Sequence, residues 1–151
     1  MNDVDFFNLI VVPAVEAFRS KPGDLLRGVT ACVMLQSMTE HHFWHRMSDT
    51  TKTREQNEPA LARFKGVLRD TKLAKENWLF GEIADISNGT KHAKAEFFDL
   101  TLQSPAVYGV ARYGFPAAHE PHVFTDSSHS WLLYRLTDAL AELWKIKLGI
   151  T

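Results

Sequence analysis

The sequence predicts an all-α protein, an up-and-down bundle of four to five helices with a short β-like insertion before the last helix. Apolar residues recur at helical spacing along most of the 151 residues. The exception is the stretch 97–126, where glycine and proline are frequent and the pattern changes. The length suits a single domain, residues 1–151, whose core is large enough to need no disulfide, and the lone Cys32 cannot form one within the chain.

Two helices are expected in the first third of the chain. The first covers residues 4–19, with Asp3 as its N-cap, and Pro13 should kink or split it because proline cannot donate a backbone hydrogen bond. The second covers residues 25–47 and is capped by Asp24. Its apolar residues lie on most of its faces, which is typical of the central, buried helix of a bundle.

Three further elements and the insertion follow. A third helix begins at residues 57–59, where a proline in the first turn is tolerated. A fourth helix is expected over 73–92, with Asn88-Gly89 as its stop signal or as an interior weak point. Apolar and polar residues alternate over 98–103, which predicts an extended segment in a small hairpin or structured loop. The last helix is expected over 128–148.

Charge and hydropathy limit the classes of partner. The formal net charge is -1 with His neutral, so no global positive field marks a nucleic-acid-binding protein, although a local patch is compatible with this value. The start of the chain lacks the basic-then-apolar pattern of a secretory signal. The longest uncharged run near the start, residues 6–15, is shorter than the roughly 20 residues that span a bilayer. We therefore expect a cytoplasmic protein that does not associate with membranes.

Two polar groups interrupt otherwise apolar helices. The first is residues 40–45, Glu-His-His-Phe-Trp-His, near the end of the second helix, and the other is residues 85–92 at the end of the fourth. Short connections favour antiparallel neighbours, so the second and fourth helices should run the same way and bring their C-terminal ends together. Within the fourth helix, Asp85, Asn88 and His92 are spaced by three and four residues and therefore share one face.

Such a set of side chains suits acid–base cleavage of a phosphodiester without a cofactor. A histidine can move protons near neutral pH, and a lysine or a second histidine can stabilise a developing negative charge. The asparagine could orient a phosphate group or the histidine ring. The candidate catalytic residues are His92, Asn88, Lys91, His42 and His45.

Two other interpretations fit the same residues. His41 and His45 lie one helical turn apart and, with His92 or Asp85, could ligate a divalent transition metal, so a metal- or small-ligand-binding bundle is the first alternative. The second alternative is a non-catalytic interaction module. Cationic side chains are favoured near helix C-termini by the helix dipole, and histidine rings can simply pack against neighbouring aromatic residues there.

The run Asn88-Gly89-Thr90-Lys91-His92 resembles the Arg-Asn-x-x-x-His signature of the HEPN superfamily, with Asn88 and His92 at the motif positions. It is also similar to small bacterial helical-bundle proteins that carry an Asn-Ala-x-Lys-His type ending on a helix. The motif arginine would fall at Ser87 and is absent. Lys91 could supply the charge, but without the bidentate fork of arginine. The specific match spans a handful of residues, whereas the bundle pattern covers most of the chain.

The resemblance implies an activity and a set of partners. HEPN proteins are helical bundles, many of them metal-independent endoribonucleases of bacterial defence or toxin–antitoxin systems. The chain would then be an RNA-cleaving domain or a degenerate ribonuclease derived from one. The resemblance implies a homodimer with its site across the dimer interface, RNA as substrate and a protein partner. A polar group on a neighbouring helix occurs in many members and would correspond here to residues 40–45.

Overall fold

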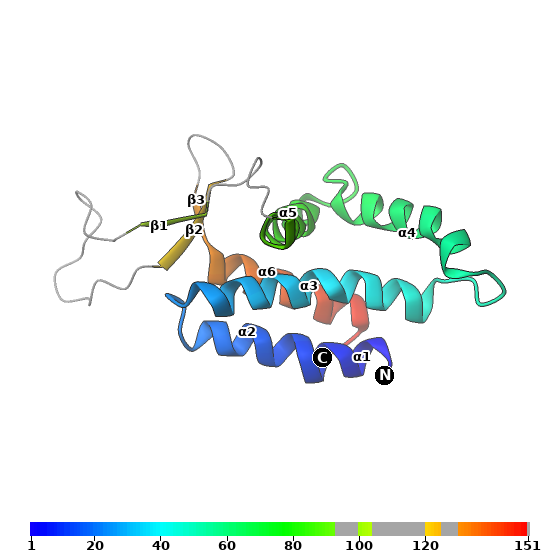
Figure 1. The fold of residues 1–151 in the computed structure, drawn as a ribbon, viewed down its shortest axis with the longest axis horizontal. Helices are drawn as coiled ribbons and strands as arrows, with labels where there is room; N and C mark the ends of the chain where they lie inside the picture. Colours follow the sequence, from blue (N-terminus) through cyan, green and yellow to red (C-terminus); the bar gives the residue numbers. More distant parts are fainter. Residues whose placement is uncertain (93–99, 104–119, 125–129, 151) are drawn as a thin grey trace.

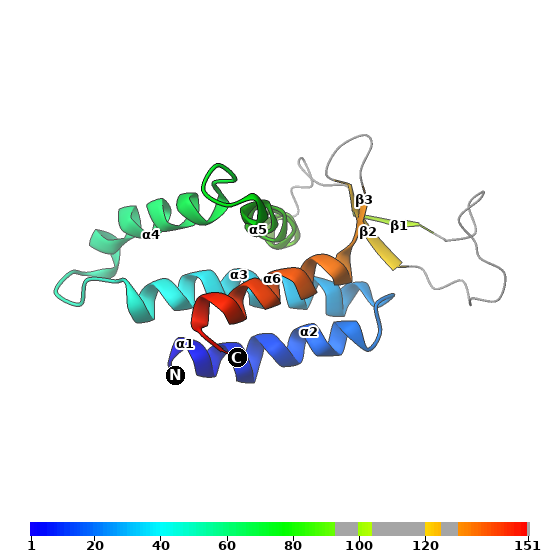
Figure 2. The same ribbon diagram turned by 180° about the vertical axis from the view of Figure 1, so that it is seen from behind.

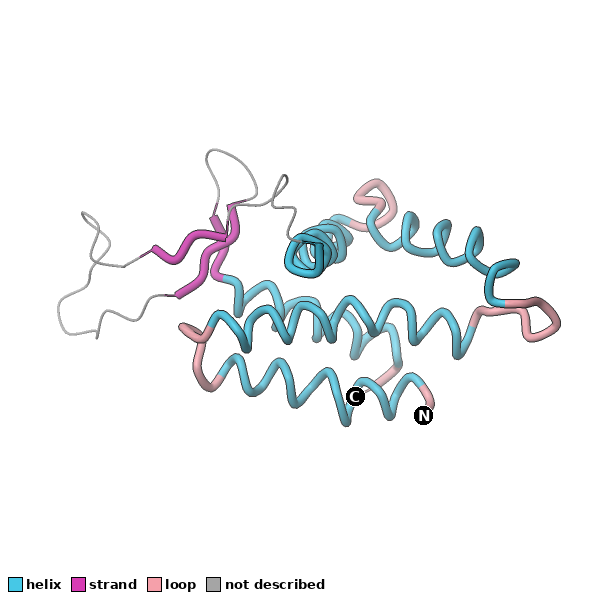
Figure 3. The backbone as a smooth tube through the Cα atoms, in the orientation of Figure 1, coloured by secondary structure: helices cyan, strands magenta, loops and turns pink. Residues whose placement is uncertain are grey.

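Helices pack around one long central helix, and short strands stand at one end of the bundle (Figures 1 and 3). The predicted all-α bundle with a short β insertion before the last helix is confirmed. The computed structural model describes residues 1–92, 100–103, 120–124 and 130–150, with side chains for residues 1–88 and 132–150.

The N-terminal segment is not split in two, but a π-helical turn interrupts its regular α-helix immediately before the proline. It consists of α1 (Asp3–Phe6), a π-helical turn η1 (Phe7–Val11) and α2 (Val12–Arg19). Pro13 has no N–H with which to continue the regular ladder, and immediately before it the Val12 N–H bonds to the Phe7 carbonyl, five residues back. The π-helical turn continues the helical backbone up to Pro13 with hydrogen bonds to the residue five positions back, so the helix does not end there. As a result, α1, η1 and α2 follow one another along a single rod (Figure 1).

The central element is α3 (Leu25–Arg46), which contacts α1, α2, α4, α5 and α6. Its central position was predicted from the spread of its apolar residues and is confirmed. Asp24 caps it as expected, by accepting a hydrogen bond from the Arg27 N–H at 3.2 Å. At Gly28 neighbouring helices approach closely, since a Cβ atom there would lie 2.9 Å from Leu133 and from Phe18.

The next helix, α4 (Arg54–Arg69), begins three residues before the predicted start. The reason is a capping box. The Thr53 hydroxyl accepts from the Gln56 N–H, and the Gln56 side chain accepts from the Thr53 N–H. Pro59 consequently lies inside the helix instead of at its first turn.

The fourth predicted helix starts later than expected. A short 3-10 turn, η2 (Lys75–Asn77), precedes α5 (Trp78–His92), because the Asn77 side-chain amide donates to the carbonyls of Val67 and Asp70 and holds a turn there. The helix continues to His92, so Asn88-Gly89 lies in its interior and is not a stop signal.

The relative direction of α3 and α5 differs from the expected one. Figure 1 shows α5 almost along its own axis, whereas α3 lies across the view, so α5 crosses α3 steeply and does not run beside it in the same direction. The turn over residues 70–77 redirects the chain between α4 and α5. The topological reason for expecting the C-terminal ends of α3 and α5 to meet is therefore removed.

The strands are β1 (Leu100–Gln103), β2 (Glu120–Phe124) and β3 (Ser130–Leu132), paired antiparallel in the order β1-β2-β3. The extended segment predicted around residues 98–103 is thus confirmed over β1, whereas residues 104–119 and 125–129 lie outside the described residues. The last helix, α6 (Leu133–Leu148), starts after the predicted residue 128 because β3 pairs with β2 first.

The core lies where α2, α3, α5 and α6 meet. Seen from behind, α6 passes in front of α3 (Figure 2). Its Trp144 is fully buried with Phe18, Ile83 and Cys32, and burial raises the pKa of the Cys32 thiol to about 12. Cys32 therefore acts as a small apolar core residue. Within the described part of the chain, the search for helices with the length and apolarity needed to cross a membrane found none.

Candidate functional site

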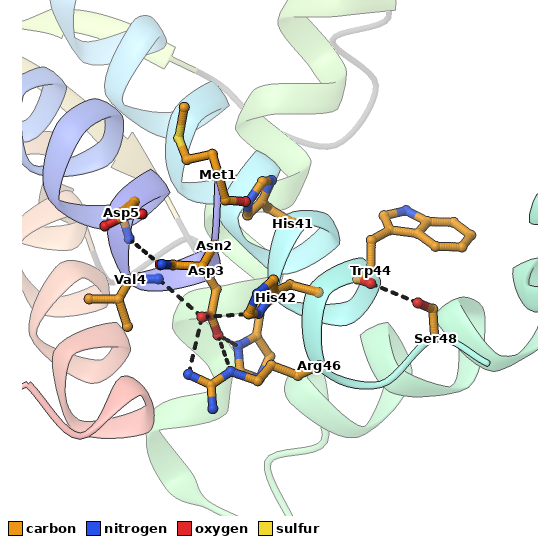
Figure 4. Close-up of polar contacts among 11 residues, drawn as sticks. Met1, Asn2, Asp3, Val4, Asp5, His41, His42, Trp44, Arg46 and Ser48 are labelled. Atoms are coloured by element: carbon orange, nitrogen blue, oxygen red, sulfur yellow. Dashed lines mark hydrogen bonds and ion pairs between the residues drawn. The ribbon is translucent and has the colours of Figure 1, made fainter. Parts of the chain in front are cut away.

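A buried carboxylate organises the polar end of α3. Asp3, in the first turn of α1, is completely buried, and its oxygens face the C-terminal turns of α3 (Figure 4). The Arg46 guanidinium donates to it twice, from Nε at 2.8 Å and from Nη2 at 3.1 Å. The Val4 backbone N–H also donates to it, at 3.1 Å. Asp3 was expected to be the N-cap, but Asn2 fills that role by accepting from the Asp5 N–H at 2.7 Å.

Two of the predicted catalytic histidines belong to this cluster. The Nδ1 atom of His42 lies 2.9 Å from Asp3 Oδ2, and Nδ1 of His45 lies 3.3 Å from Oδ1. An ionised carboxylate can only accept hydrogen bonds, so Nδ1 of His42 carries the proton and the ring is held in one tautomer. The His42 ring also packs beside Phe64 and Trp144, which leaves its side chain only 18% exposed.

The charge on Asp3 is maintained by its neighbours. Burial penalises the ionised form and would by itself raise the pKa of this carboxyl group. Hydrogen bonds from Arg46 and His42, with the charges of the same two residues, outweigh burial and hold the Asp3 pKa below its ordinary value. The cluster therefore fixes α1 against α3 with an ionised carboxylate at neutral pH.

His41 and Trp44 lie outside this cluster. The His41 ring stacks on Phe6 with centroids 4.4 Å apart, and its Nε2 atom lies 3.1 Å from the Met1 carbonyl oxygen. Trp44 points away from Asp3 (Figure 4). Phe6, His41 and Trp44 are among the residues that line an open cleft of about 440 Å³ beside the loop between α3 and α4. We call this feature the α3–α4 cleft.

The second polar group occupies the end of α5. Asn88 is exposed, whereas Ser87, at the position of the motif arginine, is completely buried. The side chains of Lys91 and His92 lie outside the described side chains, although the backbone is helical through both residues. The predicted approach of His41, His42 or His45 to Lys91 or His92 therefore stays a prediction.

The metal-binding alternative stays a prediction for the same reason. Among the residues with described side chains, no group of three or more His, Cys, Asp or Glu residues could hold a metal ion. His41 and His45 both face α1, but they contact different groups there, the Met1 carbonyl and the Asp3 carboxylate. His92, the third proposed ligand, is not among those residues.

Several residues that shape these sites were not found from the sequence. Asp3 and Arg46 pair across more than forty residues of chain, which no local pattern reveals. On α5, Glu82 is partly buried, and burial, with repulsion from Asp85, raises the pKa of its carboxyl group. The Arg69 guanidinium of α4 lies 4.0 Å from Asp85. The one available signal was the pattern of His42, His45 and Arg46, whose spacing of three and four places them on one face of a helix.

Comparison of the chain with models of protein families, with curated proteins and with solved structures gave no match.

Proposed function

We propose that this chain is an HEPN-like domain that binds RNA and acts on its phosphodiester bonds through the end of α5, as a metal-independent endoribonuclease or a degenerate form of one. One observation carries the proposal. Because α5 is helical through His92, Asn88 lies one turn before His92 on the same face of the helix. Asn88 is exposed, so this face is open to a substrate at that point.

The surroundings of α5 supply positive charge in place of the motif arginine. Ser87 is part of the core, so an arginine at this position would have no open path to a substrate. Lys91 is on the same turn as His92, and Arg69 reaches Asp85, which is one turn before Asn88. The charge of Arg69 is offset by its ion pair with Asp85, so Lys91 is the cation proposed to bind a phosphate group beside Asn88.

The proposed reaction uses general acid–base chemistry. His92 removes the proton from a ribose 2′-hydroxyl, and the 2′ oxygen forms a bond to phosphorus as the bond from phosphorus to the 5′ oxygen breaks. The 5′ oxygen takes a proton from a protonated histidine or from water. The products are a 2′,3′-cyclic phosphate and a 5′-hydroxyl end, while Lys91 stabilises the charge on the phosphate oxygens.

The direct test is RNA turnover by wild-type protein and by His92→Ala, each with and without EDTA. We expect wild-type cleavage to persist in EDTA and the variant to be slower by about 10²–10⁴-fold, the usual contribution of a general acid or base. Lys91→Ala should also slow turnover, because it removes the charge that stabilises the phosphate oxygens. Lys72→Ala, which changes an exposed lysine in the turn after α4, is its control and should leave turnover unchanged.

The other outcomes identify the alternatives. Turnover or binding abolished by EDTA, with a transition metal retained by wild type and lost from His41→Ala or His45→Ala, would replace the proposal with the metal-binding bundle. No turnover and no bound metal would contradict both chemical functions and leave the non-catalytic interaction module. As part of the same proposal, we place the protein in the bacterial cytoplasm as a homodimer with a protein partner of a defence or toxin–antitoxin system.

A further inference from the structure

The α3–α4 cleft combines aromatic faces with charged groups. One face of α3 presents Glu40, His41 and Trp44 to it, and Phe6 of α1 extends the aromatic wall by stacking on His41. The volume of about 440 Å³ lies within the range of roughly 300–1,000 Å³ typical of small-molecule sites. The lining residues come mainly from the second half of α3, the loop after it and the start of α4. Figures 1 and 3 show that this end of α3 lies opposite the strands.

The loop on the far side of the cleft is held rigidly. The buried Asn57 side chain accepts from the Asp49 N–H at 2.9 Å and donates to the carbonyls of Asp49 and Thr53 at 3.0 and 3.1 Å. Asp49 in turn accepts from the Thr51 N–H and hydroxyl. These bonds fix the loop before any ligand arrives, which lowers the entropy cost of binding.

The charged groups of the cleft differ in how fully they are already paired. The Glu40 carboxylate accepts from Lys65 Nζ at 2.6 Å, and the Asp49 carboxylate pairs with Lys52 at 2.9 Å. Among the described residues, the ion-pair partner of Arg54 is Glu58, at 3.8 Å, and both side chains of this pair are exposed. Its guanidinium lies over the Trp44 ring, 5.6 Å from the centroid. The cation with the weakest partner thus lies beside the largest aromatic face.

We propose that the α3–α4 cleft binds a nucleotide, with the base stacked on Trp44 and the phosphate paired with Arg54. Stacking on an aromatic side chain suits any base, and the planar fork of arginine matches phosphate oxygens. The carboxylates of the cleft already have cationic partners, so they do not call for a cationic ligand. The nucleotide is either free or an unpaired residue of an RNA strand, and this site does not depend on cleavage at α5.

The test measures binding without turnover. Calorimetry with AMP and with adenosine, and anisotropy with a fluorescein-labelled 2′-O-methyl hexa-adenylate, cover both sources. The 2′-O-methyl strand has no 2′-hydroxyl to attack phosphorus, so binding is separated from cleavage at α5. We expect AMP, the hexanucleotide or both to bind with a dissociation constant of about 1 mM or below.

Three variants identify the contacts. Trp44→Ala should weaken binding by about 10-fold or more, and Trp44→Phe should retain most of it because a stacking face remains. Arg54→Gln should weaken AMP by about 10-fold but leave adenosine unchanged, because only AMP carries the phosphate. Arg63→Gln, an exposed arginine of α4 that is not among the residues lining the cleft, is the matched control and should bind like wild type.

The results separate this site from the proposed function. Binding that depends on Trp44 and Arg54 supports the nucleotide site even if His92→Ala leaves RNA turnover unchanged or no turnover exists. Binding of AMP but not of the hexanucleotide would identify the ligand as a free nucleotide. Binding of the hexanucleotide but not of AMP would identify it as RNA. No binding of either ligand at millimolar concentration would overturn the site, as would binding equal in Trp44→Ala and wild type.

Discussion

At the scale of single residues, Asp3 is the clearest case of a side chain whose role depends on distant partners. A fully buried carboxylate is costly unless it is paired and hydrogen-bonded. Arg46, His42 and the Val4 N–H satisfy its oxygens, and His45 adds a further nitrogen at 3.3 Å. The cluster joins the start of the chain to the end of α3, so its loss should weaken the attachment of α1.

We expect Asp3→Asn to destabilise the protein by about 1.5–3 kcal/mol at neutral pH, the range for hydrogen bonds to charged groups. The amide keeps only one acceptor oxygen, so its NH2 group faces either the donors on Oδ1, Arg46 Nη2 and the Val4 N–H, or those on Oδ2, Arg46 Nε and His42. Urea unfolding followed by circular dichroism measures the loss, and Asp5→Asn, an exposed aspartate in the same helix, is the control. Equal stability of the Asp3→Asn protein and wild type would show that the cluster contributes nothing net.

The difference in unfolding free energy between wild type and Asp3→Asn should also depend on pH. The pKa of Asp3 is lower in the folded state than its ordinary value of 3.8, so its contribution is complete above about pH 4. It is lost as the pH falls through the lower, folded-state pKa. The difference in unfolding free energy between wild type and Asp3→Asn should therefore be constant from pH 5 to 7 and shrink below about pH 4.

At the scale of elements, two glycines of neighbouring helices differ in how closely other side chains pack against them. Gly28 of α3 allows the close approach of Phe18 and Leu133, both fully buried. Gly66 of α4 has nothing within 4 Å of the place where a Cβ would be. Both glycines have the same weak intrinsic preference for helix, so the difference between them isolates the effect of tertiary contacts.

We expect Gly28→Ala to destabilise the protein by about 1–3 kcal/mol, because a Cβ 2.9 Å from two core side chains forces them to move. Gly66→Ala should stabilise it by about 0.5–1 kcal/mol, since alanine favours the helix and loses less entropy on folding. Thermal unfolding of both variants measures the two shifts. A gain in stability for Gly28→Ala would mean that Phe18 and Leu133 can move aside at little cost.

At the scale of the whole molecule, the two ends of the chain are joined. Arg19 of α2 donates to Asp138 of α6 through Nε and Nη2 at 3.0–3.2 Å, across 119 residues of sequence. This pair joins α2 to α6, and the Asp3 cluster joins α1 to the central α3. Several large apolar side chains nevertheless remain exposed, including Leu9 at 65%, Leu26 at 75% and Ile146 at 74%.

We expect the protein to form a twofold homodimer in solution, the commonest symmetry of soluble oligomers. Exposed apolar side chains favour such an association, because burying them removes apolar surface from water. Light scattering over a hundredfold range of concentration should give twice the chain mass at the upper end. A mass equal to one chain at every concentration would contradict the dimer.

The fold class, the central position of α3, the Asp24 cap and the extended segment around β1 were all predictable from the sequence, as was a disturbance of the first helix at Pro13. These features depend on periodicity, backbone chemistry and local hydrogen bonds, which act over a few residues. The sequence also placed Asn88 and His92 one turn apart on α5, since that spacing follows from the helix alone.

Which side chains contact one another across the molecule depends on the packing of the helices and could not be predicted from local patterns. The steep crossing of α5 over α3, the pairing of Asp3 with His42 and Arg46, and the α3–α4 cleft all join residues far apart in sequence. Helix starts at Arg54, Trp78 and Leu133 also shifted from their predicted positions, because the Gln56 capping box, the Asn77 hydrogen bonds and the pairing of β3 compete with the periodic pattern. Local spacing fixes the face of a helix on which a side chain lies, whereas the packing of whole helices fixes what that face contacts.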